Sequence, residues 1–288
     1  MKEMPFQRDY VPILMYHSIS SHASRKFQPF AVPPAFFADQ MAYLYQEGYT
    51  PITVSHLVSA WSQQSTRLPE KPVVLTFDDG FADFFTTALP ILKHYRFTAT
   101  LYVSTGFVNG TSRWLSPEKE VARVMLTWKQ LVEISMSGIE CGGHSHSHPQ
   151  LDILSSRAAR EEISQCKMLL EEHLGQKICS FAYPFGYNIA QVRQSVQAAG
   201  YTSACAVRYA LCSRWDDTFA LPRLMVDASM NKDKFALLLA DHASVDHASS
   251  PIKAAYGIYA HARTSLWRIA RRYTTLGRRR YQENPGSH

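Results

Sequence analysis

Short apolar runs alternate along this chain with longer segments in which apolar residues recur every three or four positions. The short runs predict buried strands, and the longer segments predict helices, for example Ala158 to Leu174 and Ile189 to Ala199. Strands are predicted at residues 11–16, 73–78, 97–103, 138–143, 178–183, 201–207 and 221–226. Buried strands joined by helices predict an α/β fold, and a barrel with its site at the C-terminal ends of the strands suits this pattern.

Length and composition are those of one catalytic domain, which we expect over residues 1–250. The 288 residues, 46% of them hydrophobic, can bury a full core without disulfides. Five cysteines without paired spacing favour a reducing compartment. The first ten residues do not resemble a secretory signal, and no uncharged apolar run is long enough to span a bilayer. We therefore expect a cytoplasmic protein.

Residues 251–288 form a separate basic tail. They hold eight Lys and Arg residues and one acidic residue, a formal charge of +7, so the rest of the +6 chain sums to −1. Their apolar spacing predicts an amphipathic helix, which could contact anionic membrane through residues 251–281. Packing of its apolar face on the barrel is an equal alternative. RNA binding is a weaker alternative for the tail, and no nucleic-acid partner is expected, because residues 1–250 are not basic.

The segment Thr76 to Gly80 ends an apolar run with two adjacent carboxylates, Asp78 and Asp79. Gly80 permits a tight turn, through which both carboxylates can face one cleft at the strand end. One of them could then bind a cation while the other transfers protons. The alternative is an ordinary turn in which one Asp caps the following helix.

Three histidines alternate in the segment 143–149, behind another predicted strand. His144 and His148 are four residues apart, so both imidazoles can face one ion, whereas His146 should point elsewhere. Two imidazoles and one carboxylate leave positions open for water, which suits hydrolysis with a divalent ion, zinc first and Co, Ni or Mn as alternatives. A solvated histidine loop is the alternative, and the nearby Asp pair disfavours it.

A third segment, Ser180 to Gly186, is predicted to be a strand that breaks at Pro184 into a loop with an exposed backbone amide. Such an amide can donate to a developing oxyanion. Taken alone, an ordinary strand-to-helix turn is the better interpretation of this segment.

These three segments, in this order and spacing, resemble the motifs of the polysaccharide deacetylases, carbohydrate esterase family four. The resemblance spans roughly residues 70–230. Thr76 to Gly80 matches the first motif, His144 to His148 the His-Ser/Thr-x-x-His motif, and Pro184 to Gly186 the Pro-aromatic-Gly loop. The segment Pro12 to Ile19 also looks like that of members with an extra N-terminal strand. The resemblance implies a distorted (β/α)7 barrel rather than a regular eight-stranded one.

The resemblance also implies roles for individual residues. Asp78 would be the general base, and the ion would be held by Asp79, His144 and His148. The backbone amide of Phe185 would face the oxyanion.

Two departures from the family pattern affect the site. Ala182 stands where longer-studied members have the arginine that restrains the base. Arg223, at a predicted strand end, could reach Asp78 instead and keep it ionised, with a surface ion pair as the alternative. The final Leu-x-His motif, which supplies the general acid, is matched only poorly by the segment that ends at His242. A helix-end histidine is the better interpretation of His242.

We therefore expect a metal-dependent hydrolase that removes an N-acetyl group from a sugar of a glycan or glycolipid precursor, at the inner face of the bacterial envelope. Hydrolysis of a non-sugar amide by the same centre is one alternative. Another is a catalytically silent barrel that recruits partners or membrane, and the presence of Asp78 beside the ligands argues against it.

Overall fold

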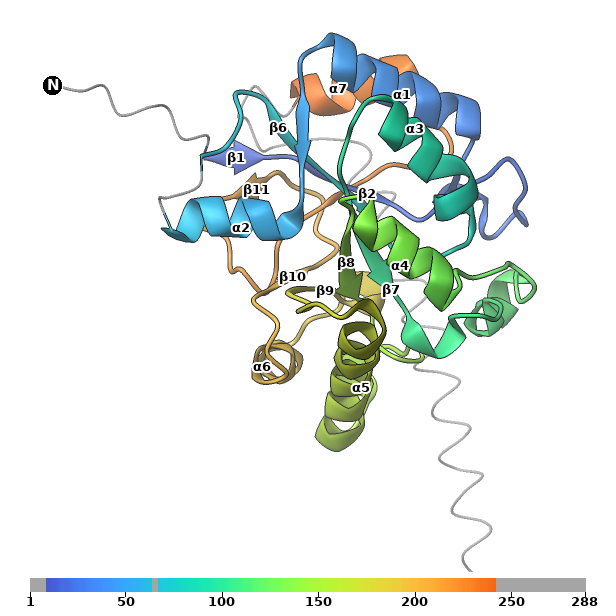
Figure 1. The fold of residues 1–288 in the computed structure, drawn as a ribbon, viewed down its shortest axis with the longest axis vertical. Helices are drawn as coiled ribbons and strands as arrows, with labels where there is room; N and C mark the ends of the chain where they lie inside the picture. Colours follow the sequence, from blue (N-terminus) through green and yellow to red (C-terminus); the bar gives the residue numbers. More distant parts are fainter. Residues whose placement is uncertain (1–8, 64–66, 242–288) are drawn as a thin grey trace, which may run out of the picture. The chain divides into compact units, whose positions relative to one another are not determined.

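The computed structural model describes residues 9–63 and 67–241 (Figure 1). The basic tail 251–288, the domain boundary at residue 250 and the candidate acid His242 lie outside these residues. The sequence-based expectations about them therefore stay predictions.

A curled parallel sheet forms the centre of the fold. Its main path runs β10-β9-β8-β7-β6-β2-β12, and every pairing along this path is parallel. A parallel bridge from Cys205 to Leu221 connects the end of β10 to the segment before β12, so the path curls back on itself. The strands are β2 (Ile13–Tyr16), β5 (Thr50–Ile52), β6 (Pro72–Phe77), β7 (Thr100–Val103), β8 (Glu140–Gly143), β9 (Ser180–Ala182), β10 (Ser203–Cys205) and β12 (Leu224–Met225).

All seven predicted strands are present, and the distorted (β/α)7 barrel is confirmed. Six of the strands are shorter than predicted, and β6 has the predicted length but begins one residue earlier. The prediction missed β5, which pairs only with the first three residues of β6. Its three residues include Pro51 and the exposed Thr50, so it carries almost none of the apolar pattern that marks a buried strand.

Helices lie outside the sheet (Figure 1). They are α1 (Pro34–Gln46), α2 (Val54–Gln63), α3 (Leu89–His94), α4 (Trp128–Met136), α5 (Ser156–Leu174), α6 (Ala190–Ala198) and α7 (Lys232–Asp241). Local chemistry sets the ends of α5, because the Ser155 hydroxyl accepts a hydrogen bond from the Ala158 amide and Gly175 ends the helix with φ 64°. The two helices predicted at 158–174 and 189–199 are confirmed. No helix in the described ranges is both long and apolar enough to cross a membrane.

Smaller elements complete the fold. β1 (Tyr10–Val11) pairs antiparallel with β11 (Cys212–Ser213), and β3 (Ser18–Ile19), just after β2, pairs parallel with β4 (Ala31–Val32). The single-turn segments are η1 (Gln28–Phe30), η2 (Phe84–Ala88), η3 (Thr105–Phe107), η4 (Arg113–Glu118), η5 (Leu151–Ile153) and η6 (Pro184–Gly186).

The alternation of side chains along β6 places the carboxylate of Asp78 inside the barrel. Leu75 and Phe77 pack in the large core cluster beneath the helices, whereas Val74 packs with Tyr102 in the inner cluster. Because successive strand residues point to opposite faces, Thr76 and Asp78 share the inner face with Val74. Asp78 therefore enters the barrel mouth from the end of a strand that is buried on both faces.

Candidate functional site

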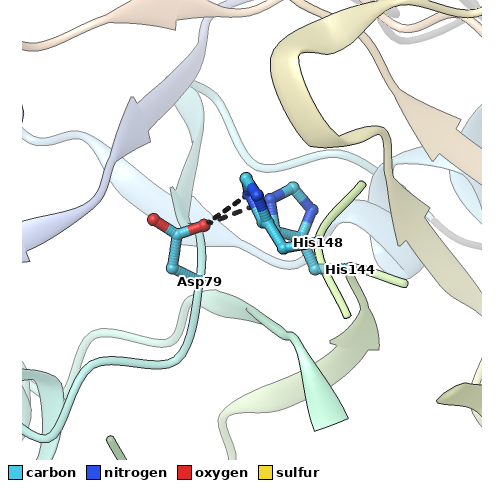
Figure 2. A group of neighbouring side chains, drawn as sticks. All are labelled: Asp79, His144 and His148. Atoms are coloured by element: carbon cyan, nitrogen blue, oxygen red, sulfur yellow. Dashed lines mark ion pairs between the residues drawn. The ribbon is translucent and has the colours of Figure 1, made fainter. Parts of the chain in front are cut away.

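Asp79, His144 and His148 converge at the C-terminal ends of β6 and β8 (Figure 2). The Asp79 Oδ1 atom lies 3.4 Å from His144 Nε2 and 3.1 Å from His148 Nε2. One potential ligand atom from each residue lies within 4.8 Å of the others, and all three side chains are buried. The structure thus brings together the three residues that the sequence predicted as metal ligands.

The three residues fit a divalent first-row ion. Ligand atoms about 2.1 Å from one ion lie about 3.0 to 3.4 Å apart in neighbouring octahedral or tetrahedral positions, which matches both measured O–N distances. Asp79 Oδ1 is buried and, within the described ranges, makes no hydrogen bond of good geometry, but faces the two imidazole nitrogens. Burial opposes ionisation of Asp79, yet His148 and His144 outweigh it and hold its pKa well below the ordinary value. The donor set of two imidazoles and one carboxylate suits Zn²⁺ and similar ions.

Left-handed backbone conformations aim these ligands. Asp79 has φ 77°, and in the histidine loop Ser145 has φ 62° and His148 has φ 55°. Such conformations are unfavourable for residues other than glycine and gather at functional sites. The Ser145 hydroxyl accepts a hydrogen bond from the His148 amide at 3.0 Å, which closes the loop and holds both imidazoles on the same side.

The carbonyl of Ala182 orients His144. It lies 2.7 Å from His144 Nδ1, so Nδ1–H donates to it and the Nε2 lone pair faces Asp79. Burial lowers the pKa of His144, but its close contact with Asp79 and the charges of Asp78 and Asp79 raise it overall. Ala182, which lacks the arginine expected at its position, therefore contributes to the site through its backbone.

His146 points away from the cluster, as predicted. Its Nδ1 atom lies 3.0 Å from the Thr105 hydroxyl, and its carbonyl accepts a hydrogen bond from the Gly106 amide at 2.7 Å. These contacts with η3 hold the histidine loop against the end of β7.

Arg223 is the partner of Asp78. Its Nη1 and Nη2 atoms donate to the two carboxylate oxygens at 2.7 Å and 2.8 Å, and the side chain is 1% exposed. Nη1 also donates to Thr76 Oγ1, and Nε donates to the carbonyl of Ala206. The contact expected from the sequence is present, and the alternative of a surface ion pair is wrong. Burial opposes ionisation of Asp78, but the charge of Arg223, followed by that of His144, lowers its pKa.

Aromatic rings surround His148. The ring of Phe185 lies 5.0 Å from the imidazole and that of Trp114 lies 5.1 Å from it, measured between centroids. Phe185 is half-buried in η6 with φ 62°, so the loop predicted after Pro184 is a tight turn beside the cluster. The donation from its amide to an oxyanion stays a prediction.

His17 belongs to the site, although the sequence analysis did not select it. It follows β2, whose last residue pairs with the last residue of β6, so it stands beside the Asp78 strand end. Burial lowers its pKa, the carboxylates of Asp79 and Asp78 oppose this, and Arg223 and His144 add to it. Its Nδ1 atom is buried and has no hydrogen-bond partner in the described part of the chain. A usable signal existed, because His17 directly follows a predicted strand, as the carboxylate pair does.

The fold and the site define a parallel α/β barrel that can hold a divalent ion at the C-terminal ends of its strands, with a buried carboxylate–arginine pair beside it.

Several known proteins are similar to the chain in sequence or in structure. A family model described as polysaccharide deacetylase matches residues 65–204. YxkH of Bacillus subtilis (strain 168), whose name describes a polysaccharide deacetylase, is 28% identical over 225 residues, which are 78% of this chain and 74% of the relative. The poly-beta-1,6-N-acetyl-D-glucosamine N-deacetylase of Escherichia coli (strain K12) is 27% identical over 159 residues, 51% of this chain and 22% of that protein. The structure of Streptococcus pyogenes deacetylase PplD in complex with acetate shares 28% identity, with a TM-score of 0.69 and coverage of 80% of this chain and 97% of that one.

Residues 65–204 thus match the polysaccharide deacetylase family model, and the resemblance predicted from the three motifs is confirmed.

Proposed function

We propose that this protein is a metal-dependent N-deacetylase that releases acetate from an N-acetylated sugar of a cell-envelope glycan or its precursor. The observation that carries the proposal is the cluster of Asp79, His144 and His148 beside the buried Asp78–Arg223 pair. The name of the Escherichia coli relative, a deacetylase of poly-beta-1,6-N-acetyl-D-glucosamine, supports an N-acetylhexosamine substrate.

The residues of the site divide the work of amide hydrolysis among them. When bound by Asp79, His144 and His148, a divalent ion lowers the pKa of a water molecule and polarises a carbonyl oxygen. Asp78, held ionised by Arg223, accepts a proton from the attacking water. The backbone amide of Phe185 donates to the negative oxygen that develops on the acetyl carbon. The buried pair keeps Asp78 at a fixed position throughout.

The leaving amine needs a proton, and His17 is the candidate donor that the described residues offer. It stands at the strand end next to Asp78. The sequence left the donor open and offered His242 only as a poor match to the family motif, and His242 stays a second candidate. Replacing each histidine separately distinguishes the two.

Acetate release is the direct test of the function. The full-length protein, stripped with a chelator and reloaded with Zn, Co, Ni or Mn, is expected to release acetate from β-1,6- or β-1,4-linked N-acetylglucosamine oligomers. The chelated protein should lose at least about 100-fold in rate, because the water would no longer be activated. Acetate or formate released mainly from simple N-acyl amines would favour the non-sugar amidase. No release with any metal would favour the silent barrel.

His17→Gln is expected to slow hydrolysis of the N-acetylated sugar by about 10²- to 10⁴-fold, the usual contribution of a general acid. Hydrolysis of 4-nitrophenyl acetate should change much less, because nitrophenolate leaves without a proton. Rates of His17→Gln and His242→Gln, measured in parallel on both substrates, show which histidine donates the proton. Equal losses on both substrates for His17→Gln would remove His17 as the donor, and a selective loss in His242→Gln would assign that role to His242.

The cytoplasmic location and the contact of residues 251–281 with anionic membrane remain a separate proposal. It is supported by the +7 charge of the tail and by its amphipathic pattern.

A further inference from the structure

A third carboxylate near this strand end, that of the largely buried Asp83, binds the two residues that directly follow His17. Asp83 Oδ2 accepts a hydrogen bond from the Ser18 hydroxyl at 2.5 Å, and Oδ1 accepts one from the Ile19 amide at 3.2 Å. Asp83 itself stands four residues after Asp79, on the turn that leaves β6. One side chain therefore ties the end of β2, which carries His17, to the end of β6, which carries the two catalytic-site carboxylates.

Arg123 completes this connection. Its Nη1 atom donates to Ser18 Oγ at 3.0 Å and lies 3.4 Å from Asp83 Oδ2, while Nη2 donates to the carbonyl of His22 at 2.7 Å. The Arg123 and Asp83 side chains are only 11% and 16% exposed. A pair shielded to this degree can hold its geometry, unlike the exposed ion pairs of a protein surface.

His17 depends on this anchoring because nothing else in the described structure fixes its ring by a hydrogen bond at Nδ1. The ring packs against Phe30, with centroids 5.0 Å apart, and this contact limits its position without defining its rotation. His144 differs, since the Ala182 carbonyl holds its Nδ1. The placement of His17 must therefore come from its backbone, and Asp83 holds that backbone at the next two residues.

We propose that Asp83, supported by Arg123, is a positioning residue for His17: it sets the distance between the proton donor on β2 and the base on β6. The inference rests on the proposed role of His17 in N-deacetylation. Asp83 acts through Ser18 and Ile19 and touches neither the substrate nor the reacting atoms. Because rates of proton transfer depend steeply on geometry, a small shift of the His17 backbone is enough to reduce turnover.

Asp83→Asn, made in the full-length zinc-loaded protein, tests the proposal. We expect kcat for an N-acetylglucosamine oligomer to fall about 10- to 100-fold, with KM, zinc content and hydrolysis of 4-nitrophenyl acetate nearly unchanged. Asp216→Asn is the matched control, because Asp216 also accepts from a backbone amide, that of Ser213, contacts an arginine, Arg208, and is 16% exposed. It lies beside β11, away from β3, and should leave kcat unchanged.

Two further measurements separate positioning from general loss of structure. In the His17→Gln background, Asp83→Asn should cause no additional loss of kcat, because both changes remove the same step. The imidazole resonances of His17 in an NMR spectrum should shift or broaden in Asp83→Asn and stay unchanged in Asp216→Asn.

The outcomes separate the positioning role from the proposed function. The positioning role is overturned if the losses of kcat from His17→Gln and Asp83→Asn multiply in the double variant. It is also overturned if the His17 resonances are unaltered in Asp83→Asn. If the wild-type protein releases no acetate but the His17 resonances respond to Asp83→Asn, the positioning role stands and the proposed function fails.

Discussion

Replacing Asp78 with Asn is expected to reduce turnover of an N-acetylated saccharide by about 10²- to 10⁴-fold, the usual effect of removing a general base, while the folded protein keeps its metal. The reason is a division of roles between two adjacent residues. Asp78 binds Arg223 through both carboxylate oxygens, whereas the Asp79 carboxylate faces His144 and His148. The asparagine amide keeps one oxygen that can accept from Arg223 but cannot accept a proton from water.

The measurement is metal content by mass spectrometry together with the rate of acetate release. His148→Ala is the contrasting variant, because it removes a ligand and should lose both metal and turnover. If Asp78→Asn loses metal as fully as His148→Ala does, the assignment of base and ligand to the two aspartates is wrong.

Replacing Arg223 with Met is expected to lower the free energy of unfolding by about 3 to 5 kcal/mol and to abolish most turnover. The Asp78 carboxylate, 3% exposed, would be left inside the barrel without its counter-charge. Thr76 and the Ala206 carbonyl would also lose their hydrogen bonds to the guanidinium. Urea unfolding of the variant, followed by circular dichroism, measures the loss.

A double-variant cycle shows whether the loss comes from the pair. Asp78→Asn combined with Arg223→Met should be less destabilised than the sum of the two single variants, because neither charge is then left alone. Arg157→Met is a control at an arginine whose side chain is 86% exposed and pairs with Glu161, and it should leave the unfolding free energy nearly unchanged. Additive losses at Asp78 and Arg223 would contradict the coupled buried pair.

The sequence by itself determined the strands, the barrel class and the three metal-ligand candidates. These features depend on patterns within a few residues: continuous apolar runs for strands buried on both faces, and polar residues placed directly after them. The Asp78–Asp79 pair ends such a run, His144 follows the shorter predicted strand 138–143, and in a parallel α/β barrel all strand C-termini meet at one end. Local pattern was therefore enough to predict that an aspartate and the two histidines converge, whereas the choice of Asp79 as the ligand came from the resemblance to the polysaccharide deacetylases.

Only the tertiary structure decided which distant side chains complete the site. The strand order puts β2 between β6 and β12, so His17, Asp78 and Arg223 come from neighbouring strands although they lie far apart in the chain. The pairing of β2 with β6 also brings Asp83, which follows β6, against Ser18, which follows β2. Hydrophobic periodicity shows which face of a strand is buried but not which strand lies beside it, because strand order and register follow from the packing of the whole sheet. The position of His17 after a predicted strand was a usable signal, but its place beside Asp78 and the contact of Asp83 with Ser18 could be recognised only after β2 was seen next to β6.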